Sequence, residues 1–183
     1  MATALVGLGA TSATAGAVTK NKHVVTYQLN CNVLNLLTLP VTVTTFDASP
    51  GSVPAGGIAN LSAVRSRVAV PASFVNLALS FGLTTLSGSI TAEDFNATNT
   101  ANGTVNAAAT PIPVGPVTLV ANQPAVLHVP AAPVTVGPWT AGTTVGSTIT
   151  YTPGEVDMTV LIPITCQPVT TPSLGHTVIR AAE

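Results

Sequence analysis

The chain has 183 residues, of which only 6% are charged, and its formal net charge is −1. Soluble domains usually carry about 25% charged residues. Because the net charge is close to zero and the pI is near 6.2, neither nucleic acid nor an anionic membrane surface is expected as a partner. No stretch approaches the ~18 consecutive apolar residues of a membrane-spanning helix, which excludes a helical transmembrane span. With 15 glycines and 15 prolines, the composition is typical of a turn-rich β protein.

The first residues have the pattern of a secretory leader. Residues 2–10 form a short apolar run, and the small residues at 13–17 fit a signal-peptidase cleavage site. The basic residue that normally opens a leader is missing, so residues 1–17 are predicted to be a truncated signal peptide. A β-strand or an unstructured tail is the alternative. Residues 18–183 are predicted to form a single β-sandwich domain.

Three stretches in the first half of the chain alternate between apolar and polar residues, the pattern of half-buried strands. They cover residues 24–31, 38–46 and 58–70. Residues 47–51, with the sequence Asp-Ala-Ser-Pro-Gly, are predicted to end the second strand as a turn.

Residues 71–82 have apolar side chains spaced for either a helix or a strand. Proline at the first position and glycine just past the last apolar residue are the start and stop signals of a helix. The sequence therefore predicts one short helix here, packed on the edge of a sheet.

The middle of the chain returns to strands. Residues 84–93 alternate, and residues 96–109, rich in Asn, Thr, Ala and Gly, predict a loop or a weak edge hairpin. Prolines interrupt the apolar runs of residues 111–138. Because proline cannot donate a hydrogen bond to a ladder, edge or bulged strands are expected there.

Two cysteines connect the two ends of the chain. Residues 144–151 and 155–166 are expected to form a hairpin around a turn at Pro153-Gly154, and 176–180 a last strand. Cys31 and Cys166 each end a run of apolar residues of one parity, so both are predicted to point into the interior and to form a disulfide. Disulfides persist outside the reducing cytosol, which predicts an extracellular or cell-surface location.

These elements predict an all-β fold, a two-sheet antiparallel sandwich with one short helix and a disulfide. In the segments VTYQLNC (25–31), FVNLALSFGLTTLSGSITA (74–92) and ITYTPGEVDMTVLIPITCQP (149–168), the chain resembles a family of secreted actinobacterial β-sandwich domains of unknown function. The resemblance implies an Ig-like sandwich and a cell-envelope or extracellular location, and it implies no activity.

The ionisable residues form no recognised catalytic or metal-binding motif. His23, His128 and His176 are far apart in sequence, and no HExxH or CxxC spacing is present. Residues 85–89 come nearest to a nucleophile elbow but lack its first glycine. We therefore predict no catalytic residue, no metal site and no cofactor.

Two pairs of charges have both a ligand-binding and a structural interpretation. Glu155 with Asp157 would suit Ca²⁺ or a catalytic pair, and Arg65 with Arg67 would suit an anion. Oppositely charged pairs between neighbouring strands on the solvent face of a sheet explain both without a ligand, and this is the interpretation that we favour.

Two further candidates are weak. Glu93 and Asp94 beside Asn96 could bind Ca²⁺ in a loop, but they lack the regular calcium-loop spacing. Trp139 is interpreted as a core or sheet-end plug rather than as a platform for a sugar.

Our first functional hypothesis is an exported, non-enzymatic surface or matrix module that contacts a cell-envelope or extracellular component, or copies of itself. The predicted contact loop holds Asn96, Asn99, Asn102 and Gly103, because loops on a rigid scaffold usually carry recognition. One alternative is a carrier of a small apolar ligand between the sheets, which an interior cavity would favour. The other is a self-assembling fibre or coat subunit.

Overall fold

The computed structural model describes residues 19–34, 36–160 and 162–182. The predicted leader, residues 1–17, lies outside them. Within the described residues, the elements in chain order are β1 (Lys20–Val33), β2 (Leu37–Pro50), β3 (Ser52–Pro54), β4 (Ile58–Val70), α1 (Ala72–Ser80), β5 (Thr85–Ala97), β6 (Thr104–Asn106), β7 (Ile112–Thr118), β8 (Ala125–Thr140), β9 (Thr148–Val160), β10 (Ile162–Pro168) and β11 (Gly175–Arg180).

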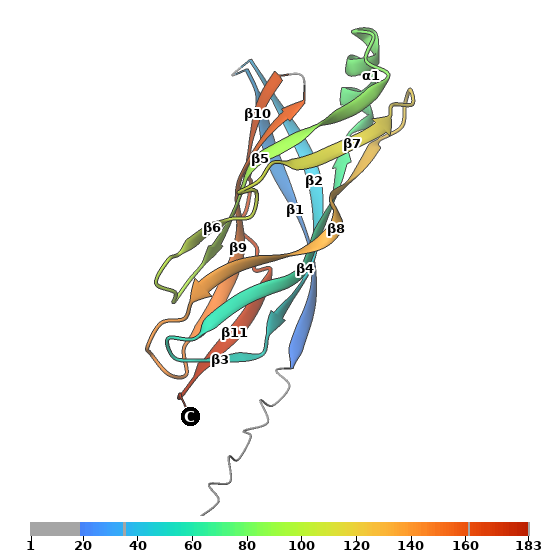
Figure 1. Ribbon diagram of the computed structural model, residues 1–183. Helices are drawn as coiled ribbons and strands as arrows, with labels where there is room; N and C mark the ends of the chain where they lie inside the picture. The colour runs from blue at the N-terminus through green and yellow to red at the C-terminus, as the bar shows by residue number, and fades with distance from the viewer. Residues whose placement is uncertain (1–18, 35, 161, 183) are drawn as a thin grey trace, which may run out of the picture.

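One hydrogen-bonded sheet connects these strands (Figure 1). Its main path runs β3-β11-β9-β10-β1-β2-β4-β8, and β5 pairs with the other side of β9 and with β6 and β7. The sheet folds over on itself, so that β10, β1, β2, β4 and β8 form one layer and β9, β5 and β7 face it. The layers meet a second time where β7 contacts β8.

The predicted β-sandwich with one short helix and a disulfide is therefore confirmed. Its two layers are continuous because β10 pairs with β9 on one side and with β1 on the other. The proline-rich region forms β7 and β8, and β8 ends the main path and has irregular register against β4, as expected for a bulged edge strand.

The predicted turn at residues 47–51 is wrong. Strand β2 continues to Pro50 because β1 begins at Lys20, four positions before the predicted start at residue 24, and supplies a ladder partner for each of residues 47–50. Pairing with β1 therefore outweighs the local turn preference of the sequence, and Asp47 becomes an interior residue of a strand.

The predicted hairpin turn at Pro153-Gly154 is also wrong. Strand β9 runs straight through both residues, and it pairs with β10 from Val160 and Ile162 onward. A Cβ on Gly154 would lie 2.9 Å from the carbonyl oxygen of Asp94, so glycine is needed for the close approach of β5. The glycine that suggested a turn serves strand packing instead.

Helix α1 forms where its start and stop signals predict it. Pro71 precedes it in an extended conformation, and Gly82 follows it with a φ of 80°. The Leu83 amide donates a hydrogen bond to the Ala78 carbonyl at 3.0 Å, which closes the last turn. Val75 and Ala78 are buried, and they anchor the helix to the strands below it.

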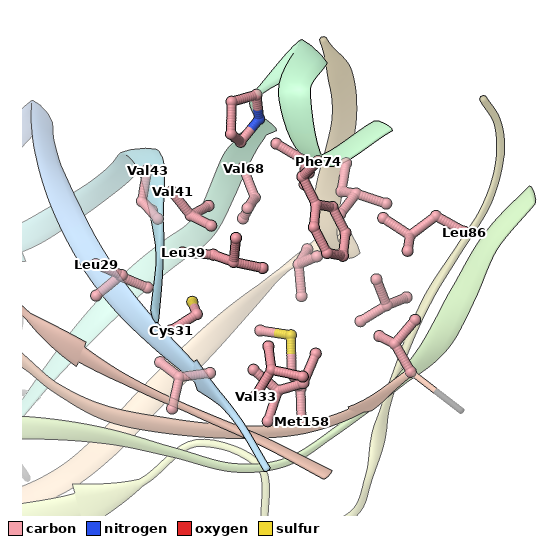
Figure 2. Close-up of a pocket in the computed structure, with 18 of the residues that line it drawn as sticks. Leu29, Cys31, Val33, Leu39, Val41, Val43, Val68, Phe74, Leu86 and Met158 are labelled. Atoms are coloured by element: carbon pink, nitrogen blue, oxygen red, sulfur yellow. The ribbon is translucent and has the colours of Figure 1, made fainter. Parts of the chain in front are cut away.

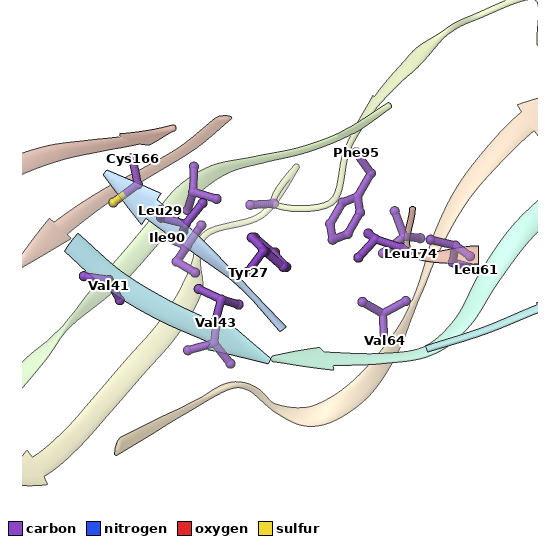
Figure 3. Packing of buried hydrophobic residues seen from close by; sticks show 14 of the residues in the cluster. Tyr27, Leu29, Val41, Val43, Leu61, Val64, Ile90, Phe95, Cys166 and Leu174 are labelled. Carbon is purple, nitrogen blue, oxygen red and sulfur yellow. The ribbon is translucent and has the colours of Figure 1, made fainter. Parts of the chain in front are cut away.

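The end of the molecule that holds β3 and β11 has a densely packed core. Trp139 is fully buried there, and its ring centroid lies 5.2 Å from that of Tyr151. Phe95, Leu61 and Leu174 pack in the same core (Figure 3). The interpretation of Trp139 as a core residue is therefore confirmed.

Cys31 and Cys166 form a disulfide across the ladder of β1 and β10, where they stand directly opposite each other. Both side chains are buried, as the parity of the two apolar runs predicts. The bond fastens β10 to β1 within one layer, and β10 is the strand whose other edge pairs with β9 of the facing layer.

Candidate functional site

An apolar cavity of about 340 Å³ lies between the two layers at the end that holds α1 (Figure 2). Side chains from β1, β2, β4, β5, β7, β8, β9 and β10 line it, together with α1. This volume lies within the range of about 300–1,000 Å³ that is usual for small-molecule sites.

The alternating pattern of the strands produces the apolar wall. Leu29 and Val33 on β1, with Val41 and Val43 on β2, all point inward, while Thr26 and Thr44 on the outer face form a hydrogen bond at 3.0 Å. Most of the wall is Val, Leu and Ile. These side chains are shorter than the aromatic rings that fill the core at the other end, so space remains between the layers.

Helix α1 lies beside the mouth of the cavity. Phe74 points from the helix towards the wall residues Val68 and Leu39 (Figure 2). Leu77 and Phe81 also belong to the lining but stay partly in contact with solvent, and Phe81 is 75% exposed. The helix therefore gives the mouth an apolar edge.

The connection from β1 to β2, which follows the lining residue Val33 and precedes the lining residue Leu37, is apolar as well. Leu34 and Leu36, in the connection from β1 to β2, are exposed, and Leu36 is 86% exposed. This connection and α1 lie at the same end of the molecule (Figure 1). Segments 32–42, 68–86, 114–127 and 158–164, which form this end, contain no Asp, Glu, Lys or Arg.

Hydroxyl groups form the inner end, or floor, of the cavity. Tyr27 and Ser66 both belong to the lining. The Tyr27 hydroxyl is 3.3 Å from the Thr45 hydroxyl, which in turn lies 2.9 Å from that of Ser66. This chain of hydroxyls crosses β1, β2 and β4 and separates the cavity from the packed core.

Glu93 supplies the one carboxyl group in the described wall of the cavity. Irregularities in the pairing of β5 with β9 lie on both sides of it, and Glu93 stands opposite Val156, which also lines the cavity. Opposite residues of an antiparallel pair share a face, so both point inward. Burial raises the pKa of Glu93 to about 7.

A second interior carboxyl, Asp47, lies beyond Thr45 on the inner face of β2 and outside the cavity lining. It is 4% exposed, and neither carboxyl oxygen has a hydrogen-bond partner among the described residues. Burial raises its pKa to about 7.

The acidic candidates on β9 remain on the outer surface and bond to the neighbouring strand β10. The Glu155 carboxylate accepts a hydrogen bond from Gln167 at 2.8 Å, and the Asp157 carboxylate accepts one from Thr165 at 2.7 Å. The two acids therefore have structural partners, but these are neutral side chains, and the expected pairing with Arg65 and Arg67 is not found among the described residues.

The basic candidates lie on β4. Arg65 stands opposite Phe46 of β2, with its guanidinium carbon 5.2 Å from the ring centroid. Arg67 stands opposite Thr44 on one side and His128 on the other. The structure therefore gives Arg65 a contact with an aromatic side chain of the same layer.

The three histidines lie in two places. His23 and His176 are near each other, because Ser49 contacts the His23 ring at 3.1 Å and donates a hydrogen bond to the His176 carbonyl at 2.9 Å. His128 lies apart from them on β8. In the part of the chain that the structure describes, no group of three or more His, Cys, Asp or Glu is arranged to hold a metal ion.

The predicted contact loop is a tight hairpin that connects β5 to β6. The Asn102 amide donates to the Pro138 carbonyl at 2.8 Å and accepts from the Thr140 amide at 3.0 Å, and Asn99 donates to the Thr148 carbonyl at 2.7 Å. Asn96 accepts a hydrogen bond from Thr104 at 2.7 Å. Gly103 has a φ of 53° in the turn. The role of these residues as contact residues stays a prediction.

Sequence reasoning missed the inward position of Glu93, which we had considered only as part of a calcium loop. The signal was present in the parity of the apolar residues of β5. Leu86 and Ile90 have even numbers whereas the buried Phe95 has an odd number, so a bulge between Ile90 and Phe95 is required to keep all three inside.

No protein family, curated protein or solved structure matches the chain. The resemblance to secreted actinobacterial β-sandwich domains therefore stays a prediction. Among the described residues, no helix has the length and apolar character needed to cross a membrane.

Proposed function

We propose that the protein binds a small apolar or amphiphilic molecule in its cavity and carries it outside the reducing cytosol. The observation that supports this function best is the cavity itself, which has about 340 Å³ of space between aliphatic walls and a polar floor. Apolar pockets with a few polar groups at defined positions are the usual form of small-molecule sites. This proposal favours the carrier over the surface module that we put first from sequence.

The mouth of the cavity supports the same function. A ligand that enters beside α1 passes Leu36 and Phe81 and meets no charged side chain on the segments that form this end. Entry of an apolar molecule at this end therefore does not require charged side chains to lose their hydration.

The location outside the cytosol is part of the proposal and is supported by the Cys31–Cys166 disulfide. A surface or matrix module, contact with a cell-envelope component, self-association and the absence of enzymatic activity all stay predictions. None of them conflicts with carriage of a ligand.

The test is to fill the cavity. Val68 points into it from β4 (Figure 2), and Val68→Trp would occupy the space that a ligand needs. The wild-type protein is expected to bind one equivalent of Nile red with a saturable rise in fluorescence. The Val68→Trp variant is expected to bind it at least about tenfold more weakly, the loss that corresponds to about 1.4 kcal/mol.

Val178→Trp is the matched control, because Val178 is an exposed valine on β11, in the end of the molecule away from the cavity. Circular dichroism would establish that both variants keep the β fold. If the folded Val68→Trp variant bound Nile red as tightly as the wild type, or if the wild type bound none, the carrier proposal would be wrong.

A further inference from the structure

The Glu93 side chain is the last position of β5 in the cavity before the packed core begins. Leu86 and Ile90 precede it along the cavity wall, and Phe95 follows it in the core. The carboxyl group interacts electrostatically with Tyr27, which belongs to the floor. The structure therefore places one acid at the inner end of a space whose walls are mostly aliphatic.

This carboxyl group has no partner within the described part of the protein. No hydrogen bond or ion pair joins it to another described residue, and burial alone accounts for its raised pKa. The side chain is partly accessible, and because it lines the cavity, a molecule in the cavity can reach it. Burial disfavours the charged form of this carboxyl group, and a ligand group that hydrogen-bonds to it would offset part of that cost.

The chemistry of the carboxyl group restricts the ligand that would pair with it. Above its pKa of about 7 the Glu93 carboxyl group is ionised and only accepts hydrogen bonds, so at such a pH the complementary head must donate them. A hydroxyl or an ammonium group does so, whereas a ligand carboxylate would place two like charges side by side. Between this floor and the mouth the wall offers aliphatic side chains, which suit a hydrocarbon chain.

We infer that the ligand is a single-chain amphiphile whose hydrogen-bond-donating head, an alcohol or an amine, enters first and binds Glu93, while its hydrocarbon chain extends towards the mouth. This inference rests on the proposed carrier function and adds the class of ligand and its direction. Tyr27 and Ser66 lie in the floor beside the head and accept hydrogen bonds from it through their hydroxyl oxygens.

The test is a series of ligands with the same chain and different heads. At a pH above the pKa of Glu93, decanol, decylamine, decanoate and decane would each compete with Nile red for the wild-type protein, its Glu93→Leu variant and its Glu93→Gln variant. Decanol and decylamine are expected to lose about tenfold or more in affinity relative to decane when Glu93 becomes Leu, because the hydrogen bond to a charged group is lost. In Glu93→Gln, decanol should keep its affinity, since the amide still accepts a hydrogen bond, and decylamine should lose its advantage.

Asp94→Asn is the control, because it removes the neighbouring carboxylate, which does not line the cavity. It should leave the order of the four ligands unchanged. If Glu93→Leu did not fold, Glu93→Gln and the wild-type series would still decide the question.

Two results would overturn the inference, and they differ in what they say about the carrier. If all four ligands bound and their relative affinities were the same with and without the Glu93 carboxyl, the carrier would stand and head recognition would be wrong. If no ligand displaced Nile red from the wild type, the proposed function would fail together with the inference.

Discussion

Asp47 shows how strongly pairing between strands determines the position of a single residue. It belongs to a segment whose composition favours a turn, yet the ladder with β1 carries it into the interior. Its carboxyl group is then desolvated without a hydrogen-bond partner among the described residues. Such a group favours its neutral form, which is why its pKa rises to about 7 from the usual 3.8.

The raised pKa of Asp47 predicts the direction of a pH effect on stability. Since the pKa in the folded protein lies above that in the unfolded chain, the folded state holds a proton more tightly between about pH 4 and pH 7. The free energy of unfolding should therefore be highest below this window, fall through it and level off above it. Glu93, whose pKa is also raised to about 7, contributes with the same sign.

The variant Asp47→Asn is expected to remove the Asp47 part of this pH dependence. Above about pH 7 it should be more stable than the wild type by about 1–3 kcal/mol, because no charge has to be buried, although the amide still lacks a partner. Urea unfolding at several pH values measures the effect. If the free energy of unfolding changed with pH in the same way in both proteins, ionisation of Asp47 would cost the folded state nothing, which would contradict the prediction.

At the scale of residues, the sequence predicted the interior well where alternation was regular. Tyr27, Leu29 and Cys31 are all buried on one face of β1, as their parity requires. The inward position of Glu93 was not predicted, because a bulge changes which positions along β5 face the interior. A bulge depends on contacts with the neighbouring strand, and a single strand's sequence does not show them directly.

Among the elements, β10 carries the connection between the two layers. It is seven residues long, and it pairs with β9 on one side and with β1 on the other. Its link to β1 includes the disulfide between positions 135 residues apart in sequence. The bond therefore restrains most of the unfolded chain as well as one short strand.

Replacement of both cysteines, Cys31→Ala with Cys166→Ala, is expected to lower the free energy of unfolding. The loop-entropy account gives about 4–5 kcal/mol for a loop of this length. Chemical denaturation of the oxidised protein and of the double variant would measure the difference. Addition of a reductant should weaken the wild type and leave the variant unchanged, and a wild type that does not respond to full reduction would contradict this account.

Local signals predicted some elements correctly and others wrongly. Proline at position 71 and glycine at position 82 marked α1 correctly, because both act within the helix and its cap. The same kind of signal at Pro153-Gly154 was misleading, since Gly154 is required by the close approach of β5 rather than by a turn. A proline and glycine pair in one strand cannot be interpreted without its partner strand.

For the whole molecule, composition and periodicity predicted a charge-poor β-sandwich, but not the difference between its two ends. One end is filled by Trp139, Tyr151 and Phe95, and the other keeps a space between aliphatic walls. The cavity depends on which strands pair, above all on the β5–β9 and β1–β10 ladders, which join segments far apart in the chain. The alternation of apolar and polar residues along one strand does not specify which other strand it pairs with.

The most direct test of the central claim is methyl NMR of the protein during titration with decanol. The account predicts saturable shifts for cavity methyl groups such as those of Leu39, Val41 and Val68, with little change for Leu61, Ile149 and Leu174 in the packed core. Shifts that fail to saturate, or that are confined to exposed residues such as Leu36, would contradict the claim that the cavity is a binding site.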